Sequence, residues 1–385
     1  MMKRNDYMKD FSLYIHIPFC EKKCYYCDFT SFKKDSTDID RYMSNLDKEI
    51  LMYEEILADY KLSTIFIGGG TPSSITSIYI KKILERIYRV FNIEELGEVT
   101  IEANPGTLNR QKIKDYKDAG INRVSLGLQS LNDNILRAIG RMHTSKDFLE
   151  SFYLLREEGF HNINVDLMLG LPGQSLVDLK NTLYRIIDLD VEHISLYSLI
   201  IEDGTLIKNW YDNGLIDLPN EDLERLMYHE SVELLRQNNY KHYEISNFAK
   251  EGYECKHNLR YWKIEPYLGV GLNSHSNLFN KRFWNQSKLI NYNESIESNK
   301  LAVEGEEIID KSMEIAEYCI MGLRLKSGII KSEYLNRFGE DIDKRYRKII
   351  KKHVHNNLIK EDYNSIVLTN KGLDLSNQVE VDFIP

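Results

Sequence analysis

The chain has 385 residues, of which 42% are hydrophobic and 28% are charged, and its formal net charge is −9. This composition can bury a large core and excludes global disorder, and the acidic balance argues against a surface built for nucleic acid. No apolar run approaches the roughly 18 residues of a membrane-spanning helix, and the first residues do not form a signal-peptide core. We therefore expect a cytoplasmic protein.

Six short β-branched or aromatic runs alternate with helix-like stretches over the first half of the chain. The expected strands are Leu13–Ile17, Thr64–Ile67, Val99–Ala103, Arg123–Leu128, Asn162–Leu169 and His193–Ile200. The expected helices between them are Tyr42–Ala58, Ile78–Phe91, Arg110–Ala119, Asp147–Glu158 and Leu176–Leu189. Such repeats form parallel sheets with right-handed crossovers. They predict an α/β fold, an incomplete (β/α)6 TIM-like barrel, with its site on the loops after the strands.

The pattern changes after about residue 205. A helix is expected at Glu221–Gln237, followed by a Tyr-, Asn- and His-rich region from His242 to Asn285. Helices near 312–324, 331–337 and 342–356 and a strand at Ile366–Thr369 predict a helical, winged-helix-like C-terminal domain. The expected units are a partial barrel at 1–240, a connecting region with the HNLRYW motif at 241–305, and the C-terminal domain at 306–385.

Three of the five cysteines, Cys20, Cys24 and Cys27, stand together directly after the first expected strand. Thiolates are soft ligands suited to iron–sulfur clusters, zinc or copper. Structural zinc usually has four protein ligands, and the nearest further candidates, Cys255 and His257, lie far along the chain. The spacing therefore favours an iron–sulfur cluster over zinc, with one iron left open.

The string YIHIPFCEKKCYYCDF resembles the signature of the radical S-adenosylmethionine (radical SAM) superfamily, which is CxxxCxxC with an aromatic residue, here Tyr26, before the last cysteine. Further segments are similar, in the same order, to the oxygen-independent coproporphyrinogen oxidase branch. They are GGGTP at 68–72, IEANPG at 101–106, SLGLQS at 125–130, GRMH at 140–143, NVDLMLGLPGQ at 164–174 and HNLRYW at 257–262. The resemblance extends from residue 12 to the end.

This resemblance implies a [4Fe–4S] cluster on the three cysteines, whose open iron binds S-adenosylmethionine (SAM) for reductive cleavage to a 5′-deoxyadenosyl radical. It also implies SAM contacts at positions that follow successive strands. These are Tyr14 near the sulfonium, Gly69, Gly70 and Thr71 through backbone N–H groups, Glu102 near the amino acid part, and Gln129, Arg141 and Asp166 near the carboxylate and ribose.

Each of these residues also has an ordinary structural reading. The glycines fit a tight turn, Glu102 a solvated strand end, Gln129 and Asp166 partners for loop amides, and Arg141 a surface ion pair of small effect. Their shared position at the ends of strands, beside the cysteines, favours the ligand roles.

The branch holds two kinds of protein, heme chaperones of the HemW group and coproporphyrinogen dehydrogenases. The dehydrogenases usually have a further cysteine where this chain has Phe29, and a longer segment before the motif than the 19 residues that precede Cys20. The HNLRYW string is similar to a chaperone motif whose histidine, here His257, is implicated in heme ligation. The hypothesis is therefore a heme chaperone with cluster, SAM and heme as cofactors. The alternative is an oxygen-independent coproporphyrinogen III oxidase that decarboxylates its substrate oxidatively.

The expected partners follow from this hypothesis. They are heme or a porphyrinogen, acceptor hemoproteins including ones at the membrane, an electron donor for the cluster and, by family analogy, a second copy of the chain. A histidine beside aromatic residues is often only structural, and Cys255 is an alternative thiolate ligand for heme. The basic stretch Lys344–Lys352 admits a DNA-binding regulator as a third class, but the acidic chain favours a solvated helix face or docking to an anionic membrane or an acidic partner.

Overall fold

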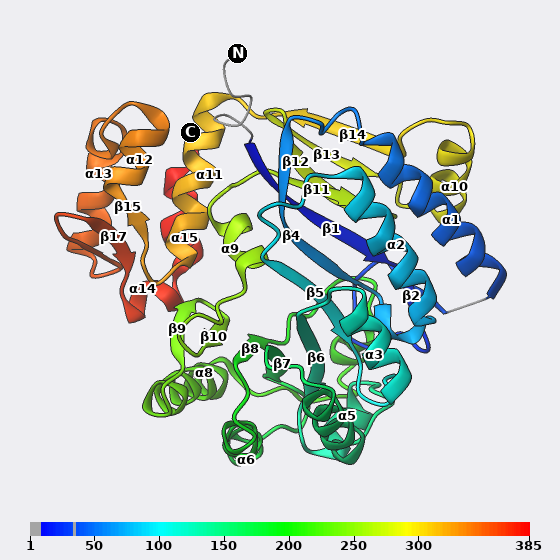
Figure 1. Cartoon of the computed structure of the whole chain (residues 1–385). Helices are drawn as coiled ribbons and strands as arrows, with labels where there is room; N and C mark the ends of the chain where they lie inside the picture. Colours follow the sequence, from blue (N-terminus) through cyan, green and yellow to red (C-terminus); the bar gives the residue numbers. More distant parts are fainter. Residues whose placement is uncertain (1–8, 34–35) are drawn as a thin grey trace.

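The computed structural model describes residues 9–33 and 36–385, and one twelve-stranded sheet organises most of them (Figure 1). Its middle consists of six neighbouring parallel strands. Each of them overlaps one of the six strands expected from the sequence. They are β1 (Lys9–Ile17), β4 (Tyr60–Gly69), β5 (Glu98–Ala103), β6 (Arg123–Gln129), β7 (Ile163–Leu169) and β8 (His193–Ser198). The predicted α/β fold with six parallel strands is therefore confirmed.

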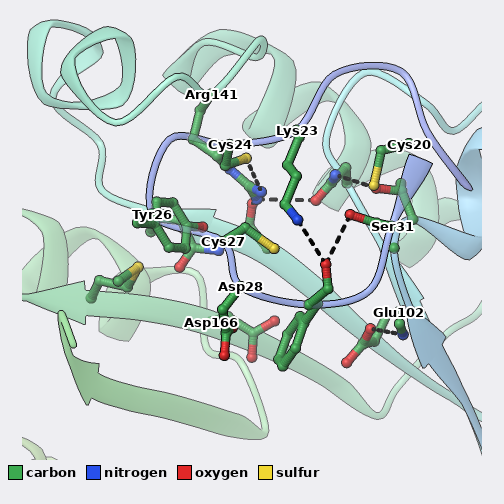
Figure 2. Close-up of a pocket in the computed structure, with 18 of the residues that line it drawn as sticks. Cys20, Lys23, Cys24, Tyr26, Cys27, Asp28, Ser31, Glu102, Arg141 and Asp166 are labelled. Atoms are coloured by element: carbon green, nitrogen blue, oxygen red, sulfur yellow. Dashed lines mark hydrogen bonds between the residues drawn. The ribbon is translucent and has the colours of Figure 1, made fainter. Parts of the chain in front are cut away.

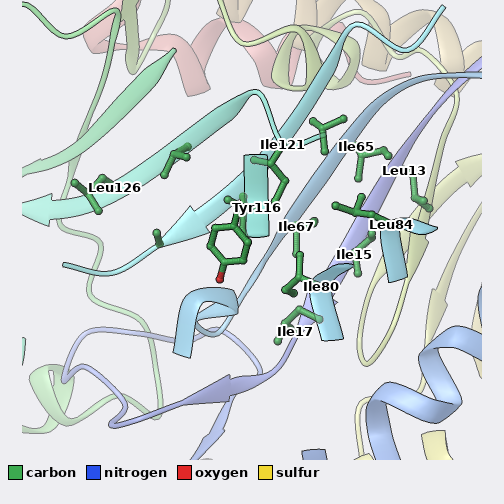
Figure 3. Packing of buried hydrophobic residues seen from close by; sticks show 14 of the residues in the cluster. Leu13, Ile15, Ile17, Ile65, Ile67, Ile80, Leu84, Tyr116, Ile121 and Leu126 are labelled. Atoms are coloured by element: carbon green, nitrogen blue, oxygen red, sulfur yellow. The ribbon is translucent and has the colours of Figure 1, made fainter. Parts of the chain in front are cut away.

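Helices cover the outer face of these strands because alternate strand residues are apolar. Leu13, Ile15 and Ile17 of β1 are buried together with Ile65 and Ile67 of β4, and Figure 3 shows these side chains packed with residues of the covering helices. The covering helices are α1 (Ser36–Met52), α2 (Ser77–Val90), α3 (Arg110–Asp118), α5 (Ser145–Glu157), α6 (Leu176–Asp188) and α8 (Glu221–Gln237), whereas α4 (Asp133–Ala138) belongs to a separate small cluster with Met168 and Leu171. The first begins and ends about six residues earlier than expected, since turns occupy residues 53–59.

The region 241–305, expected as a connection, adds strands to both edges of the same sheet. β10 (Asn247–Ala249) and β9 (Lys241–Glu244) extend it beyond β8, and β11 (Tyr267–Val270) runs parallel to β1 at the other end. The antiparallel strands beyond β11 are β12 (His275–Leu278), β13 (Lys281–Asn285) and β14 (Val303–Ile308). The order of strands begins at β14 and ends at β9, so the barrel stays open.

Shorter elements complete this part of the molecule. Two-residue strands pair in parallel at the base of the cysteine loop, and short helices lie on the connections between strands. These elements are β2 (Phe19–Cys20), β3 (Phe32–Lys33), η1 (Pro72–Ser74), α7 (Leu206–Asp212), α9 (Lys256–Trp262) and α10 (Leu289–Glu297).

The C-terminal region folds around a hydrophobic core of its own, and its helices with a three-stranded sheet fit the expected winged-helix-like domain. Its elements are α11 (Lys311–Arg324), β15 (Ile329–Ile330), α12 (Lys331–Phe338), α13 (Ile342–His355), β16 (Ile359–Glu361), β17 (Ser365–Leu368), α14 (Asn370–Asp374), α15 (Ser376–Glu380) and η2 (Val381–Phe383). Arg337 joins this region to the sheet region by donating to the carbonyls of Lys263 (2.8 Å) and Ile264 (2.9 Å). In the part of the chain that the structure describes, no helix is both long and apolar enough to cross a bilayer.

Candidate functional site

The cysteine loop follows β1 and is fixed at both ends and in its middle. The pairing of β2 with β3 closes its base. In the middle, the Tyr25 N–H donates to the Ile139 carbonyl (3.1 Å), and the Tyr25 carbonyl accepts from the Ile207 N–H (3.0 Å). The Tyr25 ring packs edge-on against Trp210 at 4.8 Å between centroids and lies directly over Gly140, where a Cβ would come within 2.8 Å of it. The loop therefore has a defined conformation without disulfides.

All three thiols of this loop line one cavity of about 410 Å³ at the carboxyl ends of the parallel strands (Figure 2). This is the edge of a parallel α/β barrel where active sites form. Most of the residues predicted from the sequence line the same cavity. They are Cys20, Cys24, Tyr26, Cys27, Gly69, Gly70, Thr71, Glu102, Gln129, Arg141 and Asp166.

The thiols have polar partners, but burial disfavours their ionised form. The Thr71 hydroxyl donates to Cys20 Sγ (3.5 Å) and Arg141 Nη1 donates to Cys24 Sγ (3.6 Å). Burial raises the pKa of Cys20 and raises that of Cys27 to about 11. A group that takes these sulfurs as thiolates must therefore compensate their charge, which positively charged iron does.

The donor set fits an iron–sulfur cluster. Within residues 9–33 and 36–385, no three His, Cys, Asp or Glu side chains gather around one point that could hold a single metal ion. In a cluster each thiolate binds a different iron, so three thiols around one cavity are sufficient. The remaining cysteines, Cys255 and Cys319, are buried and line neither this cavity nor its neighbours, so one iron would lack a protein thiolate.

Two carboxyl groups lie deeper in the cavity. Glu102 accepts from the Gly69 N–H (3.1 Å), and burial, with a further contribution from the charge of Asp166, raises the pKa of Glu102 to about 8. Asp166 accepts from Ser125 Oγ (3.1 Å) and Asn164 Nδ2 (2.6 Å), and burial raises its pKa too. Two acids with raised pKa values in one cavity are suited to receive a cationic group.

Arg141 supplies the opposite charge near the cysteines. Its Nη2 donates to Asn104 Oδ1 (3.0 Å) and to the Gly127 carbonyl, so it is partly buried and not the surface ion pair considered above. A Cβ on Gly127 would come within 2.6 Å of this guanidinium, so the glycine makes room for it. Arg141 can therefore face an anionic group in the cavity while it holds Cys24.

The expectation that the glycine-rich turn offers free N–H groups is wrong. The Gly69 N–H is used by Glu102, the Gly70 N–H donates to the Ile17 carbonyl (2.8 Å), and the Thr71 N–H donates to the Phe19 carbonyl (2.9 Å). The glycines are required for space instead. A Cβ on Gly70 would come within 2.9 Å of the Phe19 backbone, and Gly69 has a φ of +110°.

Tyr14 and His257 are not brought to the cysteines. Tyr14 lines a neighbouring cavity, where its hydroxyl lies 3.1 Å from His16 Nδ1. His257 is fully buried on α9, with Nδ1 2.8 Å from Thr64 Oγ1 and Nε2 2.8 Å from the Tyr261 hydroxyl. Both ring nitrogens of His257 are therefore within hydrogen-bond distance of hydroxyl groups in this structure.

Cys255, the alternative thiolate ligand for heme, is also enclosed by the protein. Cys255 is fully buried, its Sγ lies 3.4 Å from Glu98 Oε1, and burial raises its pKa to about 12. A thiol in this state is neutral and has a structural role.

Sequence reasoning missed two residues that organise the cavity. Asn104 accepts from Arg141 through Oδ1 and donates through Nδ2 to Thr71 Oγ1 (3.0 Å), which couples two of the predicted residues. Tyr197 at the end of β8 donates to Gln129 Oε1 (3.1 Å). Both lie at the carboxyl ends of parallel strands, and this position is the signal that would have identified them.

The basic stretch expected to dock on an anionic surface is largely paired within the chain. Lys344 and Arg345 lie beside Glu340, at 3.6 and 3.3 Å. Arg347 pairs with Glu361 (2.9 Å), and Lys352 pairs with Asp382 (2.5 Å). Much of the positive charge of α13 is thus compensated by neighbouring carboxylates.

Known proteins resemble the chain over nearly its full length. It matches the radical SAM superfamily over residues 14–186 and the HemN C-terminal domain over residues 309–375. The heme chaperone HemW of Lactococcus lactis subsp. lactis (strain IL1403) is 38% identical over 97% of each chain. The heme chaperone HemW of Bacillus subtilis (strain 168) is 38% identical over 96% of this chain and 97% of its own.

A solved structure shares the fold. Coproporphyrinogen III oxidase (HemN) from Escherichia coli, a radical SAM enzyme, aligns over 99% of this chain and 92% of its own with a TM-score of 0.86 and 22% sequence identity. At that identity the likeness establishes the architecture and not the reaction.

Proposed function

This chain belongs to the radical SAM superfamily and, within it, to the family of the HemW proteins, and from that premise we propose that it is a heme chaperone that carries a [4Fe–4S] cluster and SAM. The observation that carries the proposal is the 38% identity to two HemW heme chaperones over almost the whole chain. The cavity with three thiols supports it chemically.

Cys20, Cys24 and Cys27 would hold the cluster, each as a thiolate on one iron. Bound there, the cluster supplies one-electron chemistry and an iron without a protein ligand, at which SAM binds. Arg141 offsets negative charge at Cys24, since its guanidinium already donates to that sulfur. Tyr26 lines the same cavity.

The remaining cavity residues would orient SAM. Glu102 and Asp166, whose carboxyls lie together without a lysine or arginine bonded to either among the described residues, suit its amino group and ribose hydroxyls. Arg141 and Gln129 suit its carboxylate. Gly69, Gly70 and Thr71 contribute the shape of the cavity wall, since their N–H groups are occupied.

Heme would be the cargo, delivered to acceptor hemoproteins. The HemW relatives support this role by name, and Phe29, in place of a further cysteine, is consistent with it. The oxidase alternative has support only at the level of fold. An electron donor for the cluster and assembly into a homodimer belong to the same proposal.

The cluster is tested by anaerobic reconstitution with iron and sulfide, followed by metal analysis and electron paramagnetic resonance. We expect about four irons per chain and a signal that changes when SAM is added. Cys20→Ala, Cys24→Ala and Cys27→Ala should each lose the cluster, whereas Cys319→Ala, in the C-terminal core, should retain it. One zinc per chain, or unchanged iron in the three variants, would contradict the assignment.

Heme delivery is tested by loading the protein with hemin and adding an apo-hemoprotein. The absorbance spectrum of the apo-hemoprotein should then change to that of its heme-bound form.

A further inference from the structure

A chain of buried hydrogen bonds leads from the cavity with the three thiols into the interior of the barrel. It begins at Asp166, which lines that cavity (Figure 2). The residues behind Asp166 come from three neighbouring strands, because Asn164 of β7 lies opposite Ser125 of β6 and His193 of β8. Asn164 is 1% exposed and His193 is fully buried. Strand residues two positions apart face the same side, so Asn164 and Asp166 lie on the same face of the sheet.

The side-chain amide of Asn164 uses all of its hydrogen-bonding groups in this chain. Its Nδ2 donates to Asp166 Oδ1 (2.6 Å) and to Ser125 Oγ (2.7 Å), and Ser125 in turn donates to Asp166 Oδ2 (3.1 Å). Its Oδ1 accepts from Ser195 Oγ (3.1 Å) and lies 2.5 Å from His193 Nδ1. A side-chain amide has two donor hydrogens and one oxygen with two lone pairs, so each of these groups has a partner here.

His193 determines which way this amide faces. A carboxylate only accepts hydrogen bonds, so Nδ2 of Asn164 faces Asp166, and Oδ1 faces His193, which donates from Nδ1. The other ring nitrogen, Nε2, accepts from the Tyr243 hydroxyl (2.7 Å), and that hydroxyl accepts from the Cys255 N–H (3.2 Å). Every donor from Cys255 onward is therefore directed toward Asp166.

The surroundings of His193 keep this direction fixed. Burial and the nearby Arg123 guanidinium lower the pKa of His193 well below its usual range, so the ring is neutral and has a single N–H to donate. His193 does not line the cavity, so it acts on a ligand there only through Asn164 and Asp166. The donors behind Asp166 occupy part of the hydrogen-bonding capacity of its carboxylate, and the rest faces the cavity.

We propose that His193 is a positioning residue for SAM, because its N–H holds the Asn164 amide, and through it the Asp166 carboxylate, in the orientation that receives the hydroxyl groups of SAM. The inference rests on the proposed function, since it assumes that SAM occupies the cavity. Without the donor at Nδ1, Asn164 Oδ1 loses a partner and the amide can rotate. Rotation turns an acceptor toward Asp166, which displaces the carboxylate.

The test is the binding of radiolabelled SAM to the anaerobic, cluster-reconstituted full chain, measured by equilibrium dialysis. His193→Gln places an amide near the position of Nε2, where it can accept from Tyr243, but it offers no donor near Nδ1. His193→Asn places an amide near the position of Nδ1 and keeps a donor for Asn164. We expect the Kd for SAM to rise at least about tenfold in His193→Gln and to stay within about twofold of the wild type in His193→Asn.

A double substitution tests the route through Asp166. Asp166→Ala alone should weaken SAM binding, and adding His193→Gln should weaken it little further, because both changes act on the same carboxylate. His242→Gln is the control, since the His242 ring lies beside the Tyr228 hydroxyl and the Ile245 carbonyl instead of this chain. It should bind SAM like the wild type.

Folding is checked separately from binding. Iron content, circular dichroism and Tm equal to those of the wild type establish that each variant is folded and carries its cluster. If His193→Gln does not fold, His193→Leu carries the same prediction, because leucine is similar in size to histidine and has no donor.

The outcomes separate this inference from the proposed function. No SAM binding by the wild type overturns the function and the inference together. SAM bound equally by the wild type and by folded His193→Gln overturns the role of His193 and leaves the function standing. Equal weakening in His193→Gln and His193→Asn also overturns it, because a loss that ignores the donor at Nδ1 reflects packing alone. Fully additive losses in the double variant overturn the route through Asp166.

Discussion

Glu102 is a cavity residue whose charge state depends on pH near neutrality. Burial raises its pKa to about 8 in the folded chain from an ordinary value of 4.5. The folded state therefore holds a proton that the unfolded state has lost, and stability falls as pH rises from about 4.5 to 8. Glu102→Gln stays neutral, so we expect the Tm of this variant in cluster-free protein to rise relative to the wild type as pH increases from about 4 to 8. Parallel pH profiles would contradict the raised pKa.

His257, which the motif suggests as a heme ligand, also contributes to the stability of the fold through its buried contacts. Removing the ring leaves the buried hydroxyls of Thr64 and Tyr261 without this partner and opens a cavity beside Phe66. We expect His257→Ala to lower the free energy of unfolding by about 2–4 kcal/mol, measured by urea denaturation. Where the variant is folded, a hemin titration separates the two roles, because a ligand role predicts a changed heme spectrum and a purely structural role an unchanged one. His355→Ala, at an exposed position, should be neutral.

At the scale of elements, the contact between Tyr25 and Gly140 joins the cysteine loop to the turn after α4. Gly140→Ala would drive a Cβ into the Tyr25 ring (2.8 Å) at a φ of +79°. We expect lower iron content after reconstitution, because the loop must shift. Gly173→Ala is the matched control, since Gly173 has a similar φ (+71°) but no atom within 4 Å of its Cβ position. Equal iron loss in both variants would show that backbone strain and not the Tyr25 contact is responsible.

The long central strands could be predicted from the sequence, whereas the short strands and the long-range contacts could not. The six central strands were predictable because their apolar runs are buried and end at Gly, Pro or polar residues. The edge strands β9 to β12 contain three or four residues each, too few for a periodic signal. The cavity was predictable because its residues lie at strand ends, but the hydrogen-bond partners of His257 were not. Its partner Thr64 is 193 positions away, and only the folded sheet brings them together.

At the scale of the whole molecule, Arg337 couples the C-terminal region to the sheet region. It donates to two carbonyls after α9, pairs with Glu314 (3.0 Å) and lies over the Tyr318 ring. We expect Arg337→Ala to lower the free energy of unfolding by about 1–3 kcal/mol. Its matched control is Arg236→Ala, which loses only a pair with Glu233 on its own helix and should change little. Equal effects would contradict a coupling role.

The central claim is that the chain carries heme and does not make its precursor. The most direct measurement adds SAM, a reductant and coproporphyrinogen III to the anaerobic, cluster-reconstituted protein, and quantifies decarboxylated product per cluster, with a hemin titration of the same sample. We predict stoichiometric hemin binding and no product. Repeated turnover to protoporphyrinogen IX would contradict the claim and establish the oxidase instead.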